Sequence, residues 1–214
     1  ASALLANGRH FVGRSFKYHR PRGILSAGVE EPNALVTIGT GAMADPNIRA
    51  TVAELYDGMV ARSQNHLGSL EWDLLSVNDA FSPLFGAGFY YKTFMWPAAF
   101  WEKLYEPMIR RAAGLGALSG QDDPSRYDKG YRHCDLLVIG SGPAGLMAAL
   151  TAGRAGLRVI LAEQDFIMGG RLNAERERID GMPGAEWAAK ACAELTAMDN
   201  VMMMPRTTIY GAYD

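Results

Sequence analysis

The chain of 214 residues is 49% hydrophobic and 21% charged, a composition typical of a globular protein. Its formal net charge of −2 argues against a general nucleic-acid-binding protein, because affinity for a polyanion requires an excess of positive charge. No apolar run approaches the roughly 18 residues that cross a bilayer, so we expect neither nucleic acid nor a membrane as a partner. The two cysteines, Cys134 and Cys192, lie far apart in the sequence, which fits a reducing, cytoplasmic location.

The first part of the chain is predicted to form short elements joined by loops. The opening ASALLANG is typical of an amphipathic helix that ends at Gly8, not of a signal peptide. A chain that begins within a helix is expected to be a fragment. Strands are predicted in RHFVGRSF (9–16) and in NALVTIGT (33–40).

The following segment contains two helix signals and an unassigned region. Pro46 indicates the start of a helix in PNIRATVAELYDGM. Residues 63–91 mix aromatic residues with Gly and Pro and predict no clear element. In residues 96–116 the helical spacing of apolar side chains predicts a helix, with a kink at Pro107.

The stretch GRSFKYHRPRG (13–23) carries four Lys or Arg side chains and a histidine without any carboxylate. The planar guanidinium groups of the arginines within the stretch Arg14–Arg22 suit a phosphate-bearing cofactor or an acidic partner. A solvated surface or a role within the domain is the alternative, and the net charge disfavours nucleic acid.

A polar, turn-rich segment, SGQDDPSRYDKGYRH, predicts a linker at residues 119–133. It separates a first domain at residues 1–118 from a second that begins at residue 134 and continues to residue 214.

The second domain opens with CDLLVIGSGPAGLMAALTAGRAGLRVILAEQD, residues 134–165. The apolar run DLLVIG predicts a parallel strand buried on both faces. Gly140, Gly142 and Gly145 then form a G-x-G-x-x-G motif at the start of a helix rich in small residues. A second strand, LRVILAE, ends at Glu163, 18 residues after Gly145. This strand–turn–helix–strand pattern predicts a Rossmann-type dinucleotide-binding unit of an α/β domain.

Each motif residue has a predicted role. Gly140 makes the tight turn, Gly142 admits the pyrophosphate and Gly145 lets the helix pack closely on the strand. Glu163 is expected to accept hydrogen bonds from the adenosine ribose, and its charge disfavours a 2′-phosphate. The predicted cofactor-binding residues are Gly140, Ser141, Gly142, Pro143, Ala144, Gly145, Glu163, Gln164, Gly170 and Arg171.

The turn GPAG and the later segment EQDFIMGGRL look like the flavoproteins with two dinucleotide-binding units, where the first unit usually holds FAD. Residues 200–214 predict a third strand, after which the sequence is too short for a complete domain. No catalytic residue is identified.

Several of these segments together resemble the alpha subunits of heterotetrameric sarcosine oxidase, in their N-terminal part. The resemblance rests on GRSFKYHRPRGI, EEPNALV, YEPMIRRAAGLG, HCDLLVIGSGPAGLMAAL and RTTIYGAYD. Relatives of this family include the opine- and proline-dehydrogenase subunits and the hydrogen cyanide synthase subunits.

The resemblance implies a ferredoxin-like β-grasp fold for the first domain. In several relatives the basic stretch leads into a cysteine loop that holds a [2Fe–2S] cluster. Here Ser26, Glu30, Glu31 and Ala34 stand roughly where thiolates would be, and a cluster needs four thiolates or a two-thiolate, two-histidine set. Because no cysteine precedes Cys134, we expect a first domain without an iron–sulfur cluster or any other metal.

The resemblance also implies a function and cofactors. The family oxidises sarcosine to glycine, with hydrogen peroxide and methylene-tetrahydrofolate as products, in a complex of alpha, beta, gamma and delta subunits. It carries FAD in beta, FMN between alpha and beta, and NAD in alpha, so NAD is the predicted ligand of the motif, with FAD as the alternative. The basic stretch would then contact another subunit or a flavin phosphate.

Two other functions stay open. One is the FAD-binding electron-transfer subunit of an opine, proline or cyanide-forming dehydrogenase. The other is a scaffold subunit in which the nucleotide is purely structural.

Overall fold

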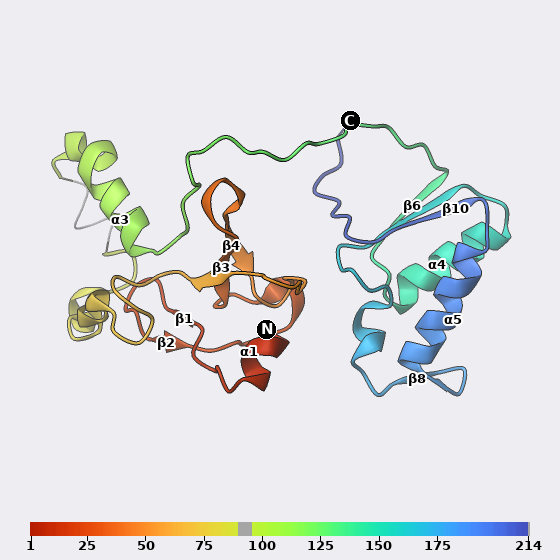
Figure 1. Ribbon diagram of the computed structural model, residues 1–214, viewed down its shortest axis with the longest axis horizontal. Helices are drawn as coiled ribbons and strands as arrows, with labels where there is room; N and C mark the ends of the chain where they lie inside the picture. The colour runs from red at the N-terminus through yellow and green to blue at the C-terminus, as the bar shows by residue number, and fades with distance from the viewer. Residues whose placement is uncertain (90–95, 214) are drawn as a thin grey trace. The chain divides into compact units, whose positions relative to one another are not determined.

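The computed structural model describes residues 1–89 and 96–213, so residues 90 and 91 of the unassigned segment lie outside it. The chain divides into two compact units, Ala1–Arg126 and Tyr127–Asp214 (Figure 1). The division falls within the segment predicted as a linker.

Unit 1 is built on short antiparallel strands. After α1 (Ser2–Ala6), strands β1 (Gly13–Arg14) and β2 (Pro21–Arg22) form a hairpin. A second sheet has the order β4-β3-β5, formed by β3 (Leu35–Ile38), β4 (Asp45–Arg49) and β5 (Ala61–Ser63). A small core of Val12, Ala34, Val36 and Ala50 lies between these elements.

The helix predicted from Pro46 is wrong, because residues 46–49 belong to strand β4 and residues 50–59 form turns and loop. Ile48 pairs with Val36 of β3 and packs against the core of unit 1. β4 lies at the edge of its sheet, where a proline such as Pro46 is tolerated because its missing N–H costs no ladder bond. Tertiary pairing therefore overrides the local helix signal.

The other regular elements described in unit 1 are short helices joined by turns and loops. The single helix predicted over residues 96–116 is instead a succession of three forms: a 3₁₀ turn, a π-helical turn and α3 (Glu106–Ala112). The change from π to α form occurs next to Pro107, where the kink was predicted. Within residues 1–89 and 96–126, the 3₁₀ and π helices are η1 (Gly28–Glu30), η2 (Gly41–Met43), η3 (Leu74–Asp79), η4 (Ser82–Leu84), η5 (Ala98–Phe100) and η6 (Trp101–Tyr105).

Unit 2 has the predicted order of strand, helix and strand. β6 (Leu136–Ile139), α4 (Pro143–Arg154) and β7 (Val159–Ala162) are followed by α5 (Gly184–Thr196) and β10 (Val201–Met204). The parallel sheet has the order β10-β7-β6, so the predicted third strand is confirmed. Between β7 and α5 lie η7 (Gly170–Asn173) and a hairpin of β8 (Arg178–Ile179) and β9 (Met182–Pro183).

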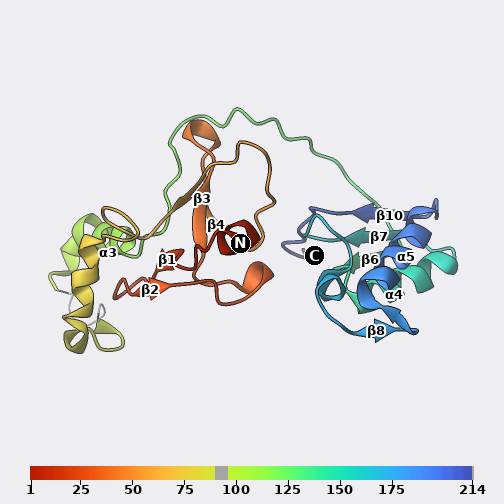
Figure 2. The same cartoon turned by 60° about the horizontal axis from the view of Figure 1, so that its bottom comes forward.

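The core of unit 2 lies between the sheet and the two helices. Figure 2 shows α4 and α5 side by side, and buried side chains from both join one apolar cluster with β7. All four residues of β7 are buried. Within the described residues β6 lies at the edge of the sheet and only its Val138 is buried, so the predicted burial on both faces is not seen in this part of the domain.

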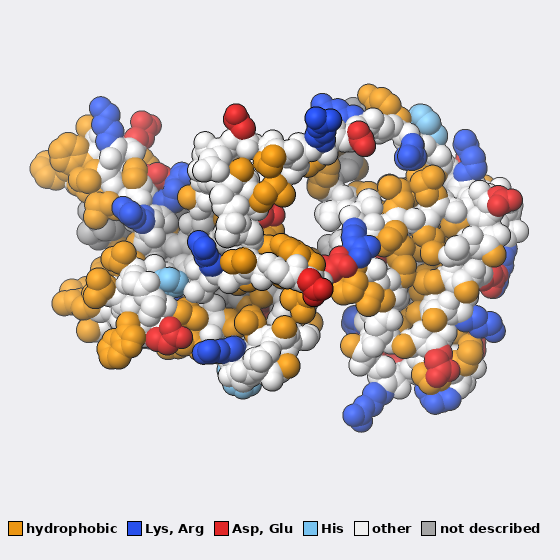
Figure 3. All heavy atoms as spheres, viewed as in Figure 1, with side chains coloured by type: hydrophobic (Ala, Val, Ile, Leu, Met, Phe, Trp, Pro, Cys, Tyr) orange, Lys and Arg blue, Asp and Glu red, His pale blue; other side chains and the backbone are white. Residues whose placement is uncertain are grey.

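Apolar side chains are also exposed on unit 1. Figure 3 shows hydrophobic side chains on the surface over α3 and its neighbours, where Trp96 is 83% and Met108 is 60% exposed. Among the described residues, no helix is both long and apolar enough to cross a membrane.

Candidate nucleotide-binding site

The glycine motif forms the turn between β6 and α4. Gly140 has φ of 91°, a left-handed conformation that favours glycine, and its N–H donates to Ala162 of β7. A Cβ on Gly145 would lie 1.9 Å from the carbonyl oxygen of Gly140, so only glycine fits where the helix meets the turn. A Cβ on Gly142 would meet no atom within 4 Å, which leaves open space beside the backbone.

The N-terminus of α4 has no side-chain cap. Gly142 is the N-cap residue, and Pro143 and Ala144 follow it in the first turn. The first N–H groups of a helix have no intrahelical acceptor, and the helix dipole adds partial positive charge there. Together with the space beside Gly142, this end of α4 has the features that favour a phosphate group.

Ser141 and Glu163 connect the motif to the end of β7. Both the backbone N–H and the hydroxyl of Ser141 donate to Glu163 Oε2, at 2.8 and 2.6 Å. Both residues are buried. The carboxylate predicted to bind ribose therefore also holds the glycine turn in place.

The pKa of the Glu163 carboxyl lies below its ordinary value. Burial alone would raise that pKa, but hydrogen bonds from the Asp165 N–H and from Ser141 favour the ionised form and outweigh it. The group is thus an anion at neutral pH, at the end of β7 and next to the glycine turn.

The segment after β7 folds back onto the glycine turn. The N–H of Gly169 donates to the Ser141 hydroxyl at 3.0 Å, and a Cβ on Gly170 would lie 3.2 Å from the Cα of Gly142. Gly170 therefore lies beside the open space at Gly142. Gly169 was not among the predicted site residues. The structure gives it a left-handed φ of 116°, and the Gly169–Gly170 pair is the signal in the sequence that could have indicated it.

Two of the predicted cofactor-binding residues, Gln164 and Arg171, have exposed side chains. Gln164 is exposed immediately after the buried Glu163. The Arg171 guanidinium forms an exposed ion pair with Glu175 at 2.6 Å, and its side chain is 84% exposed. Arg171 would have to leave this ion pair to reach a pyrophosphate.

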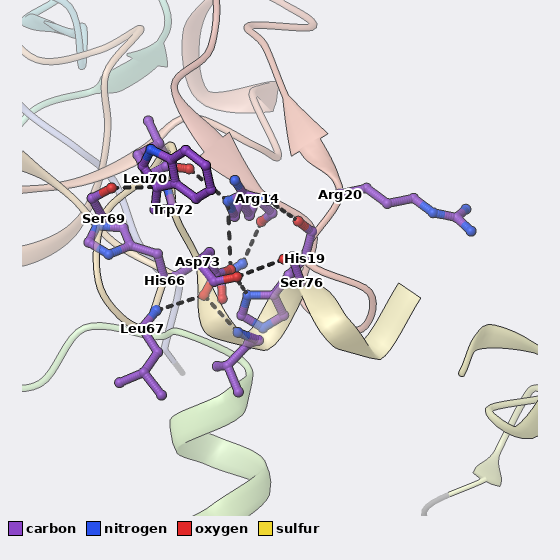
Figure 4. A network of polar contacts seen from close by, with 12 residues as sticks. Arg14, His19, Arg20, His66, Leu67, Ser69, Leu70, Trp72, Asp73 and Ser76 are labelled. Atoms are coloured by element: carbon purple, nitrogen blue, oxygen red, sulfur yellow. Dashed lines mark hydrogen bonds and ion pairs between the residues drawn. The ribbon is translucent and has the colours of Figure 1, made fainter. Parts of the chain in front are cut away.

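The basic stretch of unit 1 makes contacts within its own unit (Figure 4). The Arg14 guanidinium is nearly buried and donates to the carbonyl oxygens of His19, Leu70 and Glu71. His19 lies between Asp73 and the carbonyl oxygen of Ala112 in α3, with its ring nitrogens at 2.5 and 3.0 Å. These contacts tie the stretch to η3 and α3.

Lys17 and Arg20 of the stretch also have partners within unit 1, and Arg22 lies exposed at the surface. Lys17 donates to the carbonyl oxygen of Phe85, and Arg20 forms an ion pair with Asp79 at 2.6 Å. Of the interpretations left open by the sequence, a role within the domain accounts for these contacts. Sequence reasoning missed Asp73, because it lies 54 residues from His19 and no spacing links the two.

The residues of unit 1 do not fit an iron–sulfur cluster. Both cysteines of the chain belong to unit 2. Within residues 1–89 and 96–213, no group of three or more His, Cys, Asp or Glu side chains is arranged to hold a metal ion. The first domain therefore offers none of the thiolates that a cluster requires.

Two family models match separate parts of the chain. Residues 1–66 match a 2Fe-2S iron–sulfur cluster binding domain, and residues 135–196 match FAD-dependent oxidoreductases. Over 99% of this chain, the fold is similar to 30% of L-proline dehydrogenase from P. horikoshii, with a TM-score of 0.52 and 17% identity. Unit 1 is thus similar to 2Fe-2S iron–sulfur cluster binding domains and unit 2 to part of the FAD-dependent oxidoreductases.

Full-length sequence relatives are more specific. The chain is 62% identical over all its 214 residues to the sarcosine oxidase alpha subunit of Rhizobium meliloti, of which it covers 22%. The corresponding protein from Corynebacterium is 38% identical, again over 100% of this chain and over 18% of the relative. The chain is a homologue of sarcosine oxidase alpha subunits, as the resemblance indicated. It spans about a fifth of the length of these relatives.

Proposed function

We propose that unit 2 binds the ADP half of a dinucleotide at the N-terminus of α4. The observation that carries this proposal is the uncapped helix end beside the open space at Gly142, with the turn held by Ser141 and Glu163. The pyrophosphate would lie on the N–H groups of the first turn, where Pro143, Ala144 and Gly145 stand. Glu163 would accept hydrogen bonds from the ribose, with Gln164, Gly170 and Arg171 at the rim.

The two candidate dinucleotides, FAD and NAD, are supported by different observations. The match to FAD-dependent oxidoreductases favours FAD, and neither family match supports NAD. NAD follows from the resemblance to the sarcosine oxidase family alone. Because the βαβ unit contacts the ADP moiety that both molecules share, the described residues favour neither.

We propose that the whole protein is the alpha subunit of a flavin-dependent sarcosine oxidase. Its reaction would convert sarcosine to glycine, with hydrogen peroxide and methylene-tetrahydrofolate as products. The identity of 62% to a named sarcosine oxidase alpha subunit supports this function. When bound, the flavins supply the oxidation chemistry, and the residues of this chain bind a nucleotide without touching the substrate.

The same proposal includes partner subunits. The relatives are named as alpha subunits, which supports a complex with further subunits. The beta, gamma and delta chains, the FMN between alpha and beta and the cytoplasmic location follow from the resemblance alone. The exposed apolar side chains over α3 support a surface covered in the assembly, either by the rest of the alpha chain or by a partner.

A second candidate is the FAD-binding subunit of an opine or proline dehydrogenase. An opine oxidase chain of Agrobacterium tumefaciens is 33% identical over 81 residues, which cover 36% of this chain. The shorter match, and the absence of cysteine from residues 1–133, make this function the weaker one.

The test is to purify the intact complex, denature it and identify every released nucleotide by chromatography and mass. One ADP-containing dinucleotide per chain, beyond those bound by the partner subunits, is expected. NAD at that ratio supports the sarcosine oxidase function in full, and FAD without NAD supports the dehydrogenase relatives. The absence of any such dinucleotide would contradict the proposed site.

A further inference from the structure

A buried carboxylate lies at the centre of an exposed loop in unit 1. The side chain of Glu31 is completely buried, whereas Leu25 of the same loop is 74% exposed. A carboxylate loses its hydration when buried and is tolerated only where hydrogen bonds replace the water. The loop must therefore provide those bonds.

Four backbone N–H groups converge on this carboxylate. Oε2 accepts hydrogen bonds from Leu25 and Ser26 at 2.7 and 2.8 Å. Oε1 accepts hydrogen bonds from Asn33 and Ala34 at 2.7 and 3.2 Å. The carboxylate thus joins the start of the loop to its end, just before β3.

Backbone amides, not a cation, balance the negative charge. Among the described residues, no lysine or arginine forms an ion pair with Glu31. Burial alone would raise the pKa of the Glu31 carboxyl, but the four N–H donors hold that pKa below its ordinary value. The group is an anion at neutral pH.

Concave sets of converging backbone N–H groups bind anions, and iron–sulfur sites use them to surround a cluster. Residues 1–66 match a cluster-binding domain, yet they contain no cysteine. The set of N–H groups is present within this match, but its centre is filled by a side chain of the chain itself.

We propose that the Glu31 carboxylate takes the place of an iron–sulfur cluster as the anion around which the loop of residues 25–34 folds. Unit 1 is then a structural domain without an electron-transfer centre, because a carboxylate has no accessible second oxidation state. This inference is independent of the proposed nucleotide site, which lies in unit 2.

The test uses the full chain with three variants. Glu31→Ala removes the anion, Glu31→Gln keeps one carbonyl acceptor, and Glu30→Gln is a matched control on the exposed neighbouring residue. Hydrogen exchange measures the protection of the four amides, and iron and sulfide are assayed after expression in iron-rich medium.

We expect protection of all four amides to fall at least about tenfold in Glu31→Ala. In Glu31→Gln one pair of amides keeps its acceptor and the other pair loses it, so protection should fall in one pair only. If Glu31→Ala does not fold, this loss of protection in one pair is the result that supports the proposal. Glu30→Gln should match the parent chain, which should contain no stoichiometric iron. Iron and sulfide at two atoms each per chain, or unchanged protection in both Glu31 variants, would overturn the proposal.

Discussion

The Nδ1 atom of His19 lies 2.5 Å from Oδ2 of Asp73, and neither side chain is exposed to solvent. Asp73 also accepts hydrogen bonds from the N–H groups of Leu67 and Leu75 and so caps η3. The Asp73 carboxylate therefore connects the basic stretch to the start of η3.

Arg14 Nε also lies 3.6 Å from Oδ2 of Asp73, in a buried ion pair. We expect Asp73→Asn to lower the free energy of unfolding by about 3–5 kcal/mol, because it leaves the buried His19 and Arg14 without their carboxylate. Asp79→Asn is the control, since its ion pair with Arg20 is exposed and such pairs contribute about 0–1 kcal/mol. Urea denaturation measures both variants. Equal losses would show that burial of the His19–Asp73 pair does not matter.

Gly142→Ala and Gly145→Ala separate nucleotide binding from folding. A methyl group on Gly142 meets no protein atom, so we expect stability within about 1 kcal/mol of the parent and nucleotide affinity at least about tenfold weaker. A methyl group on Gly145 collides with Gly140, so we expect a loss of about 1–3 kcal/mol or more in the free energy of unfolding. Calorimetric titration with ADP and thermal unfolding are the measurements. If Gly142→Ala binds as tightly as the parent, the open space beside it is not the pyrophosphate site.

Glu163 should make the stability of the chain depend on pH in the acid range. Its pKa is lower in the folded chain than in the unfolded chain, so its contribution is fully present above the unfolded value of about 4.3 and is lost as the pH falls through the folded pKa. We expect Glu163→Gln to reduce the acid-induced loss of stability. The exposed Glu177→Gln should keep the parental slope in denaturation measured at successive pH values. Identical slopes for the two variants would contradict the role given to Glu163.

Arg171 tests the rim of the site. If its guanidinium contacts the pyrophosphate, Arg171→Ala should weaken nucleotide binding by about tenfold, the effect of one charge-assisted hydrogen bond. Glu175→Gln releases Arg171 from its exposed ion pair and should leave affinity unchanged or make it tighter. Both variants should keep the parental stability, because the pair is exposed. An unchanged affinity in Arg171→Ala would remove this residue from the site.

The βαβ unit of the second domain could be predicted from the amino-acid sequence alone. Its signals are local: an apolar run, glycines at fixed spacing and an acidic residue at the end of the next strand. Such patterns lie within about 30 residues, and the backbone conformations they require are set by the residues themselves. The absence of cysteine before residue 134 was equally plain, and the resemblance to sarcosine oxidase alpha subunits was confirmed over the whole chain.

The contacts that join distant segments became known only from the folded chain. Residues 45–49 form a strand because β3 offers a pairing edge, although Pro46 indicated a helix. The basic stretch has its partners 54 to 93 residues away, at Asp73 and Ala112, and no spacing in the sequence encodes them. Glu31 was recognised only as a residue in place of a thiolate, whereas the four amides that surround it follow from the path of the loop. Local propensity fixes backbone conformation within a segment, but the partner of a buried charge depends on which segments the fold brings together.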